Sequence, residues 1–388
     1  MLVDLLFLIT GVGFLLIFCY LLFLAAASLW PRKKELLSAP AIRFGVIIPA
    51  HNESELIGRT LKKLQSINYP SELYEVIVVA DNCDDNTGEI AESLGASCLY
   101  RYDPDKRGKG AALHWVFPQL LSTGNHDAYV VIDADTHMAE NFLTVINHHL
   151  LQGAEVVQAY SEPRHPDRSP LESLAFLGFA LNRNLRYHGR SRLGWSANLM
   201  GTGMCFARNI IAKYGWNTTT MVEDIEYGMF LRLQNVRVVF AYDARISVEI
   251  HKDIDQSQGQ RTRWDMGKFE VRNRYLPQLL RKGIEKRDLG YFDSAMELLL
   301  PPFSIFVIMV LACFGLYVLF DFQKETFNFY IWISIVVSLI FYIFTGLLTA
   351  RASFKVYRSL FYAPFFLLWR SWILLLESFK GKNKQRQW

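Results

Sequence analysis

Tyr129-Val-Val-Ile-Asp-Ala-Asp135 is the stretch that decides the fold of this chain. Its apolar first half, Tyr129–Ile132, predicts a short buried strand, and two carboxylates follow it at once. Asp133 and Asp135 leave the strand one residue apart, so their carboxylate groups can approach one point. Such oxygen ligands suit Mg²⁺ or Mn²⁺ held together with a diphosphate. The stretch therefore predicts a metal site at a strand end.

Two further apolar runs, N-terminal to this one, are also followed by polar clusters. Phe44–Ile48 leads into Pro49-Ala-His-Asn-Glu53, and Tyr74–Val79 leads into Asp81-Asn-Cys-Asp-Asp85. In an open parallel sheet, ligands bind in the crevice beyond the carboxyl ends of the strands. Helix capping is the alternative explanation for such residues, and it suffices for Asn86. The three matching placements predict one binding crevice.

Residues 43–250 have the pattern of a soluble α/β domain. Short β-branched runs, with Val236–Phe240 as the fourth, alternate with segments of helical period, such as the one in which Ile57, Leu61 and Leu64 recur. Strands that alternate with helices imply a parallel sheet whose connections cover both faces. The fold class predicted from the residues is therefore α/β.

The composition of the chain is too apolar for an ordinary soluble protein. Hydrophobic residues make up 51%, and the formal net charge is only +4, so part of the chain should lie in lipid. The polar region shows no basic stripe with interleaved aromatics, which argues against nucleic acid as a partner. The five cysteines form no CxxC pair. They fit a reducing compartment and argue against structural disulfides or zinc.

An apolar run at residues 3–29 is long enough to cross a bilayer of about 30 Å as a helix. A cleaved signal peptide is the alternative, because Ala25-Ala-Ala27 offers small residues. The run carries Asp4, has no basic region before it and is followed at once by Pro31-Arg-Lys-Lys34, which favours an uncleaved anchor. The basic flank predicts an integral protein of the inner cell membrane whose next residues lie in the cytosol.

Two more apolar runs, 295–320 and 328–350, are predicted to span the membrane. Residues 354–378 are also apolar and aromatic, but Pro364 and Arg370 interrupt them. If they crossed, the basic tail after them would lie outside, against the positive-inside tendency. We therefore expect a helix in the cytosolic interface, with a fourth span as the alternative.

These features divide the chain into four predicted parts. Residues 1–41 form the transmembrane anchor and a basic linker, and residues 42–250 form the cytosolic domain. Residues 251–293 form interface helices, and residues 294–388 form the C-terminal membrane helices, the interfacial helix and the basic tail.

Common nucleotide-binding motifs are missing from the sequence. No GxGxxG run follows a strand, and no GxxxxGK[ST] loop occurs. Gly108-Lys-Gly110 is explained by a turn before a helix, although Lys109 could also neutralise a donor phosphate. Met221-Val-Glu-Asp224 and Glu226 lie at the start of a predicted helix, Ile225–Leu233, where carboxylates are ordinary dipole partners.

Six short motifs nevertheless occur in a fixed order. They are Ile48-Pro-Ala-His-Asn-Glu53, Ala80-Asp-Asn-Cys-Asp84, Asp133-Ala-Asp135, Gly201-Thr-Gly203, Val222-Glu-Asp224 and Gln260-x-x-Arg-Trp264. With this order and spacing over residues 43–270, the sequence resembles glycosyltransferase family 2. It is most similar to the membrane-bound synthases of cellulose, chitin, hyaluronan and poly-N-acetylglucosamine. The resemblance implies the GT-A fold, a Rossmann-like mixed sheet with flanking helices, beside transmembrane and interfacial helices.

The resemblance also implies a role for each matching residue. The loop of Pro49, His51, Asn52 and Glu53 would bind the donor, as would Asp81 at the nucleoside and Asp133, Gln260 and Arg263 at the diphosphate. Asp135, together with Asp133, would hold the metal. Asp224 would act as the general base, with Glu223 in the same acidic motif. Trp264 would stack on a sugar ring of the acceptor, and the loop of Gly201 and Gly203 would border it.

The chemistry of these residues agrees with the implied roles. Loss of a nucleoside diphosphate requires charge neutralisation, which a divalent ion with Arg263 and Lys109 could supply. A carboxylate at Asp224 could take the proton of the attacking hydroxyl. Direct attack on the far face inverts the anomeric centre, so an α-linked donor gives a β-linked product.

The sequence also departs from the family pattern. Val222-Glu-Asp stands where Thr-Glu-Asp is usual, and Ala80-Asp-Asn-Cys stands where Asp-Asp-Gly-Ser is commoner, which leaves Asp81 as the one leading acid. The predicted membrane portion is smaller than that of the large polymer-exporting synthases. Export by this chain alone is therefore not implied.

The leading hypothesis is a glycosyltransferase that builds a β-linked exopolysaccharide or cell-envelope glycan from a UDP-sugar, with GDP as the other option. The alternative is transfer of a single sugar to a lipid acceptor. A third hypothesis is a non-catalytic nucleotide-sugar sensor, which would be expected to lose Asp135, Asp224 or Trp264, yet all three are present. The expected partners are the nucleotide-sugar donor, a glycan or lipid acceptor and membrane lipids. Export or assembly partners cannot be read from the sequence.

Overall fold

The computed structural model describes residues 2–31, 36–249, 254–320 and 327–379, with the side chains of residues 2, 254–265 and 373–379 outside the description. The chain forms two compact units, each of which is described by itself. The sheet unit is built from Arg32–Arg164 and Trp195–Leu298, and the helical unit from Met1–Pro31, His165–Gly194 and the residues from Leu299 on. Both units are discontinuous in sequence.

Within the described residues, eight strands form one sheet in the order β3-β2-β1-β4-β7-β6-β8-β5. Its first half comprises β1 (Phe44–Ala50), β2 (Tyr74–Asp81), β3 (Ser97–Arg101) and β4 (Ala128–Val131). These strands are parallel neighbours, with Ile48 opposite Val78 and Ile47 opposite Val131. The three apolar runs that the sequence analysis singled out therefore end at the same edge of the sheet.

The second half of the sheet comprises β5 (His137–Met138), β6 (Val156–Pro163), β7 (Met204–Ala207) and β8 (Val238–Val248). β7 runs antiparallel to both β4 and β6, and β5 runs antiparallel to β8. The sheet is therefore mixed, as the family resemblance implied, and the purely parallel sheet expected from the alternation alone is wrong. The reason is the connection from β6 to β7, which passes through the helical unit and is not a helix packed across the sheet.

The helices that cover the sheet are α2 (Ile57–Leu64), α3 (Thr87–Ser93), α4 (Lys109–Thr123), α5 (Phe142–Leu151), α8 (Arg208–Tyr214) and α9 (Glu223–Leu233), with a short 3-10 turn, η1 (Ser71–Leu73). Of these, α2 and α9 lie where the sequence analysis predicted helices. Ile57, Leu61 and Leu64 are buried in the core cluster beside Val46 and Val78. Two further helices, α10 (Ile254–Lys286) and α11 (Leu289–Leu299), complete the sheet unit.

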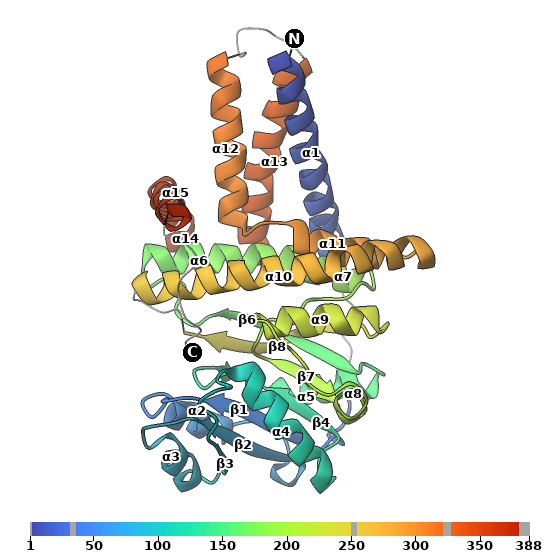
Figure 1. The fold of residues 1–388 in the computed structure, drawn as a ribbon, viewed down its shortest axis with the longest axis vertical. Helices are drawn as coiled ribbons and strands as arrows, with labels where there is room; N and C mark the ends of the chain where they lie inside the picture. The colour runs from blue at the N-terminus through green and yellow to red at the C-terminus, as the bar shows by residue number, and fades with distance from the viewer. Residues whose placement is uncertain (1, 32–35, 250–253, 321–326, 380–388) are drawn as a thin grey trace. The chain divides into compact units, whose positions relative to one another are not determined.

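The helical unit contains α1 (Leu2–Ser28), α6 (Pro170–Ala180), the π-helix η2 (Leu181–Tyr187), α7 (His188–Arg192), α12 (Phe303–Phe320), α13 (Phe327–Thr349), α14 (Phe354–Ser359), the 3-10 turn η3 (Leu360–Tyr362) and α15 (Ala363–Phe379). Helices α1, α12 and α13 run side by side (Figure 1). Aromatic rings join them, with Tyr317 stacked on Trp332 at 6.0 Å and edge-on to Phe7 at 5.5 Å between ring centroids.

Three helices in the described part of the chain are long and apolar enough to cross a membrane: Val3–Ser28, Phe303–Phe320 and Phe327–Thr349. The second begins later than residue 295, where the sequence analysis started it. Pro301 and Pro302 separate α11 from α12, because proline lacks the amide hydrogen that a continuing helix needs. α15 is not among these three, so the interfacial position expected for it stays a prediction.

Candidate active site

Asp133 and Asp135 follow β4 directly, at the edge where β1 and β2 also end. The backbone N–H of Asp133 donates a hydrogen bond to Thr202 Oγ1 over 3.1 Å. Thr60 Oγ1 on α2 donates to the Ala134 carbonyl over 2.5 Å. The loop that carries the two carboxylates is thus held from both sides.

Lys109, the first residue of α4, joins two of the predicted motifs. Its ammonium group donates a hydrogen bond to the Asp133 carboxylate and another, of 2.7 Å, to the Gly201 carbonyl. Burial lowers the pKa of Lys109, but the charges of Asp133, Glu223 and Asp224 outweigh that effect and the net shift is upward. The lysine therefore remains positively charged at neutral pH among these carboxylates.

Glu223 and Asp224 form the first turn of α9. Asp224 Oδ1 accepts a hydrogen bond of 2.8 Å from the Ile225 N–H. Burial raises the pKa of both carboxyl groups, their mutual repulsion adds to the shift of Glu223, and Lys109 opposes the shift in both. A carboxylate with a raised pKa accepts a proton more readily, which suits a general base.

The glycine loop lies against these two groups. A Cβ added at Gly201 would lie 3.5 Å from Asp224 Oδ2 and 3.8 Å from Lys109 Nζ. Gly201 and Gly203 have φ values of +77° and +68°, in the left-handed region that favours glycine. The tight backbone predicted at these glycines is therefore present, and the structure brings Gly201, Lys109, Asp133 and Asp224 together.

Hydrogen bonds join the Pro49–Glu53 loop to the loop that follows β2. His51 Nδ1 lies 2.8 Å from the Asp81 carbonyl, and the Glu53 N–H donates to Thr87 Oγ1 over 2.8 Å. Asn52, at φ +55°, accepts a 2.8 Å bond from the Asp84 N–H through its side chain. The Pro49–Glu53 loop and the loop after β2 thus form one wall.

Asp81 is fully buried in that wall. Its Oδ1 accepts hydrogen bonds from Arg101 and, over 2.9 Å, from the Asn82 amide. Its Oδ2 has no hydrogen-bond partner among the described residues. Burial raises the pKa of Asp81 against the lowering effect of Arg101. Arg101 and Asn82 therefore fix one oxygen of this carboxylate inside the wall.

The carboxylates at the strand ends fit a divalent cation. Burial, followed by the charges of Asp135, Asp133 and Asp85, raises the pKa of Glu53 to about 7. The site thus holds more negative charge than Lys109 neutralises. No group of three or more His, Cys, Asp or Glu side chains in the described chain is placed to hold a metal alone. A cation at Asp133 and Asp135 would need further oxygen ligands, such as those of a diphosphate.

No motif pointed to Gln158, and Thr202 was quoted only as the middle residue of Gly201-Thr-Gly203, without a role. Gln158 on β6 is fully buried; its amide donates to the Thr202 carbonyl over 2.8 Å, and its Oε1 accepts from the Met200 N–H over 2.9 Å. It thereby fixes the glycine loop to β6, while the Thr202 hydroxyl in that loop accepts from the Asp133 N–H. The available clue was a single amide within the apolar run Val156–Tyr160.

Glu226 forms hydrogen bonds and an ion pair in addition to the expected interaction with the dipole of α9. It is buried, and one carboxylate accepts 2.8 Å hydrogen bonds from the N–H groups of both Thr219 and Thr220. It also forms an ion pair of 2.6 Å with Arg274 on α10. Glu226 therefore joins the turn before α9 to α10 as a structural residue.

Gln260, Arg263 and Trp264 lie in the N-terminal part of α10, where the side chains are outside the described residues. Their predicted contacts with the diphosphate and the acceptor stay predictions.

Comparisons with known proteins match the region of the chain that carries these motifs. The family model described as glycosyltransferase-like family 2 matches residues 40–267, which is more than half of the chain. A probable glycosyltransferase, YdaM of Bacillus subtilis, is 28% identical over 274 residues, covering 64% of this chain and 61% of its own length. The β-monoglucosyldiacylglycerol synthase of Synechocystis is 25% identical over 60% of this chain and 48% of its own.

The poly-β-1,6-N-acetyl-D-glucosamine synthase of Staphylococcus epidermidis is 23% identical, covering 58% of this chain and 54% of its own length. The match thus spans about half to three fifths of these curated relatives. Among solved structures, the mannosyltransferase PcManGT of Pyrobaculum calidifontis, in complex with GDP-Man and Mn²⁺, superposes with a TM-score of 0.58 at 16% identity. This match covers 92% of this chain and 97% of that one. The chain belongs to glycosyltransferase family 2 and has the GT-A fold.

Proposed function

We propose that this chain is an inverting hexosyltransferase that transfers a sugar from a nucleotide-sugar, most simply a UDP-sugar, to a growing β-linked glycan at the cytosolic face of the inner membrane. One observation carries the proposal. Lys109, whose ammonium group bonds both Asp133 and the Gly201 carbonyl, lies 3.8 Å from a Cβ built on Gly201, and Asp224 lies 3.5 Å from the same point. A diphosphate-binding group and a base thus meet at one loop.

The proposed reaction divides between these groups. Asp224 takes the proton of the acceptor hydroxyl, and the acceptor oxygen bonds to the anomeric carbon on the face opposite the nucleotide. The bond from that carbon to the diphosphate oxygen breaks, and the diphosphate keeps the electron pair. The positive charge of Lys109 stabilises the charge that develops there. Mg²⁺ or Mn²⁺ held by Asp133 and Asp135 would supply further neutralisation of the diphosphate.

The unpaired oxygen of Asp81 supports binding of a nucleobase. Uracil and guanine both carry a ring N–H in the position to donate to a carboxylate, and Asp81 Oδ2 is a buried acceptor without a partner in the described chain. A buried acceptor that stays unpaired costs about 1–3 kcal/mol. We therefore expect donors with UDP, and then GDP, to bind more tightly than donors with CDP, whose base lacks that N–H.

Transfer of one sugar to a lipid acceptor is the second candidate. The relative named β-monoglucosyldiacylglycerol synthase, 25% identical, supports a glycolipid product. The relative named poly-β-1,6-N-acetyl-D-glucosamine synthase, 23% identical, supports the polymer. Three helices able to cross a membrane are compatible with either acceptor. The size of the product separates the two.

The test is transfer by the purified full chain in lipid nanodiscs. A panel of UDP- and GDP-sugars with Mg²⁺ or Mn²⁺ is compared for the wild type, Asp135→Ala, Asp224→Asn and an exposed control, Glu72→Gln on η1. Products are sized by mass spectrometry. The expected result is metal-dependent turnover that the control retains and that falls by about 10²-fold or more in both site variants.

The size of the product distinguishes the two candidate acceptors. A ladder of products favours the growing glycan, and a single added hexose on a lipid favours the second candidate. Nucleotide binding without turnover of any donor would contradict the enzyme proposal and favour a sensor.

A further inference from the structure

A second pocket lies in the sheet unit, and none of its lining residues belongs to the candidate active site. It has a volume of about 780 Å³ and is open to solvent. Its walls come from α2, β5, β8 and the end of β6, four elements distant in sequence. We call it the basic pocket; the cations that line it are Arg59, Lys62, Lys63, Arg164 and Arg245.

The charges of the basic pocket are unbalanced. Five Arg and Lys side chains line it, against the single carboxylate of Glu162. Glu162 pairs with Arg245 at 3.4 Å, and Glu249 pairs with Arg164 at 3.1 Å. Arg59, Lys62 and Lys63 on α2 form no ion pair within the described part of the chain. Positive charge therefore remains for a ligand.

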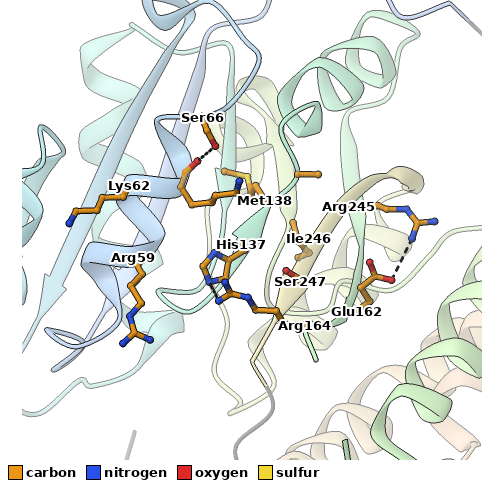
Figure 2. Close-up of a pocket in the computed structure, with 12 residues that line it drawn as sticks. Arg59, Lys62, Ser66, His137, Met138, Glu162, Arg164, Arg245, Ile246 and Ser247 are labelled. Atoms are coloured by element: carbon orange, nitrogen blue, oxygen red, sulfur yellow. Dashed lines mark hydrogen bonds and ion pairs between the residues drawn. The ribbon is translucent and has the colours of Figure 1, made fainter. Parts of the chain in front are cut away.

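Two of the arginines are held in place before any ligand binds. Figure 2 shows Arg164 against His137, and Arg164 Nη1 lies 2.6 Å from His137 Nε2. The guanidinium of Arg245 bonds Glu162, as the same view shows, and lies 4.5 Å from the centroid of the Tyr160 ring. A fixed guanidinium loses less entropy when it binds a phosphate than a free one does.

His137 is a half-buried imidazole in the wall of the basic pocket. Burial lowers the pKa of its imidazole, and Arg164 lowers it further; Glu249 opposes them, and Lys63 and Arg59 add smaller lowering effects. The ring is therefore neutral at neutral pH, and its Nε2 accepts from Arg164. An exposed row of cations on a helix is ordinarily only solvated. Here cations from separate elements line one concavity that also holds a half-buried imidazole.

The position of the pocket in the chain suggests where its ligand comes from. Arg164 is the last residue of the sheet unit before the chain enters the helical unit, which carries the three helices able to cross a membrane. The covalent connection keeps Arg164 within one residue of that unit. This short covalent link to the helices able to cross a membrane is the reason to test a membrane lipid as the source of the phosphate.

We propose that the basic pocket binds a phosphate-bearing anion at a site separate from the nucleotide-sugar site, and that an anionic membrane lipid is its source. Planar guanidinium groups bond phosphate oxygens in pairs, and lysines add point charges, so Arg164, Arg245 and the α2 cations match this chemistry. The inference goes beyond the proposed function, because it concerns residues that take no part in transfer.

The test measures binding and not turnover, using the purified full chain in detergent. The double variant Arg59→Gln/Lys63→Gln is compared with Lys213→Gln/Arg281→Gln, which removes the same charge from exposed positions on α8 and α10. Native mass spectrometry follows short-chain phosphatidic acid against phosphatidylcholine. Calorimetry follows glycerol 3-phosphate as the soluble phosphate ester.

We expect phosphatidic acid to bind the wild type and the control alike, and the pocket variant about tenfold more weakly, as befits the loss of charge-assisted hydrogen bonds. If only glycerol 3-phosphate distinguishes the variants, the phosphate site stands and the lipid source is wrong. If neither ligand distinguishes them, the basic pocket is solvated surface and the proposal is overturned.

Discussion

Asp224 is half-buried at the start of α9, beside Lys109, and loss of water around its carboxyl group raises the pKa of that group. Asparagine has the same shape but cannot take a proton. We expect Asp224→Asn to lower kcat by about 10²- to 10⁴-fold, because a general base contributes that much. The KM for the donor should stay nearly unchanged. Steady-state kinetics measures both, with Glu72→Gln as the control.

The same substitution should not lower stability. A carboxyl group whose pKa is raised by folding destabilises the fold when it is ionised, and this cost grows as pH rises from its ordinary pKa to the raised one. Asp224→Asn removes the cost, so its melting temperature should equal or exceed that of the wild type at pH 8 and gain less at pH 5. A lower melting temperature at pH 8 would contradict this assignment of the charge.

The pKa of the Asp85 carboxyl group is lowered, whereas that of Asp224 is raised. Burial opposes it, but hydrogen bonds from the side chain and N–H of Thr87 and from the Ser54 N–H lower the pKa of its carboxyl group. The two N–H bonds measure 3.0 and 3.1 Å. Ionised Asp85 therefore stabilises the fold above its ordinary pKa of about 3.9, and this contribution disappears as pH falls through the lowered value.

We therefore expect Asp85→Asn to reduce the free energy of unfolding by about 1–2 kcal/mol at pH 7, where bonds to a charged acceptor are lost. The deficit should shrink as the pH is lowered below about 4. Denaturant unfolding at several pH values measures it. Asp84→Asn, at the exposed neighbouring position, serves as the control and should show no such pH-dependent deficit.

At the scale of residues, much of the candidate site could be predicted because its groups sit in short contiguous motifs at strand ends. Asp133, Asp224 and Gly201 were named from such motifs, and the structure brings them together through Lys109. Gln158 could not be named in the same way. It bonds two backbone groups of a loop more than forty residues away. Such partners are brought together only by the fold, so residue spacing in the sequence does not predict them.

Helices α9 and α10 are joined by the ion pair of Glu226 and Arg274, whose side chains are 3% and 42% exposed. Arg274→Ala leaves a buried carboxylate with only its threonine partners. We expect a loss of about 1–3 kcal/mol in the free energy of unfolding, because removing one partner of a buried pair is costly and this arginine is partly solvated.

The matched control lies on the same helix. Arg281 pairs with Glu285 one turn later, and its side chain is 82% exposed. Arg281→Ala should cost only about 0–0.5 kcal/mol. Adding Glu226→Gln to Arg274→Ala should recover part of the loss, since the buried charge is then removed. If Arg274→Ala and Arg281→Ala reduced the free energy of unfolding equally, the buried carboxylate of Glu226 would not be the cause of the loss.

At the scale of elements, the parallel strands β1, β2 and β4 were predictable because their buried runs are β-branched and each ends in a polar cluster. The antiparallel β7 was not, because its four residues, Met204–Ala207, are paired by long-range hydrogen bonds and follow a helical segment. The start of α12 was also misplaced from hydropathy alone. Pro301 and Pro302 are apolar enough to extend a run but cannot extend a helix.

At the scale of the whole molecule, the sequence predicted an anchor, a domain and a membrane end in succession, whereas both compact units are discontinuous. His165–Gly194 leaves the sheet between β6 and β7 and packs with α1 and the helices that follow Leu299. Composition cannot reveal this, since the segment combines the apolar stretch Leu174–Leu181 with charged residues on either side, a mixture that a soluble domain can also contain. Its attachment depends on contacts with residues more than one hundred positions away.

Gly189 on α7 tests that attachment. A Cβ added there would lie 2.1 Å from the Leu24 carbonyl oxygen of α1, and the neighbouring Arg190, fully buried, bonds Tyr20 Oη over 3.0 Å. Alanine at this position forces the two helices apart, because a backbone carbonyl cannot move aside as a flexible side chain can. We expect Gly189→Ala to lower the melting temperature in detergent, with a loss of about 1–3 kcal/mol for overpacking.

Gly178 on α6 supplies the control, since nothing lies within 4 Å of a Cβ built on it. Gly178→Ala should be neutral or should stabilise the helix by about 0.5–1 kcal/mol, because alanine loses less backbone entropy than glycine on folding. Both variants add one methyl group to a helix of the same unit. Helix propensity alone therefore predicts that both substitutions change the free energy of unfolding in the same direction. Opposite signs would establish that α1 packs directly on α7. A gain for both variants would mean that the contact of Gly189 with Leu24 does not hold the helical unit together.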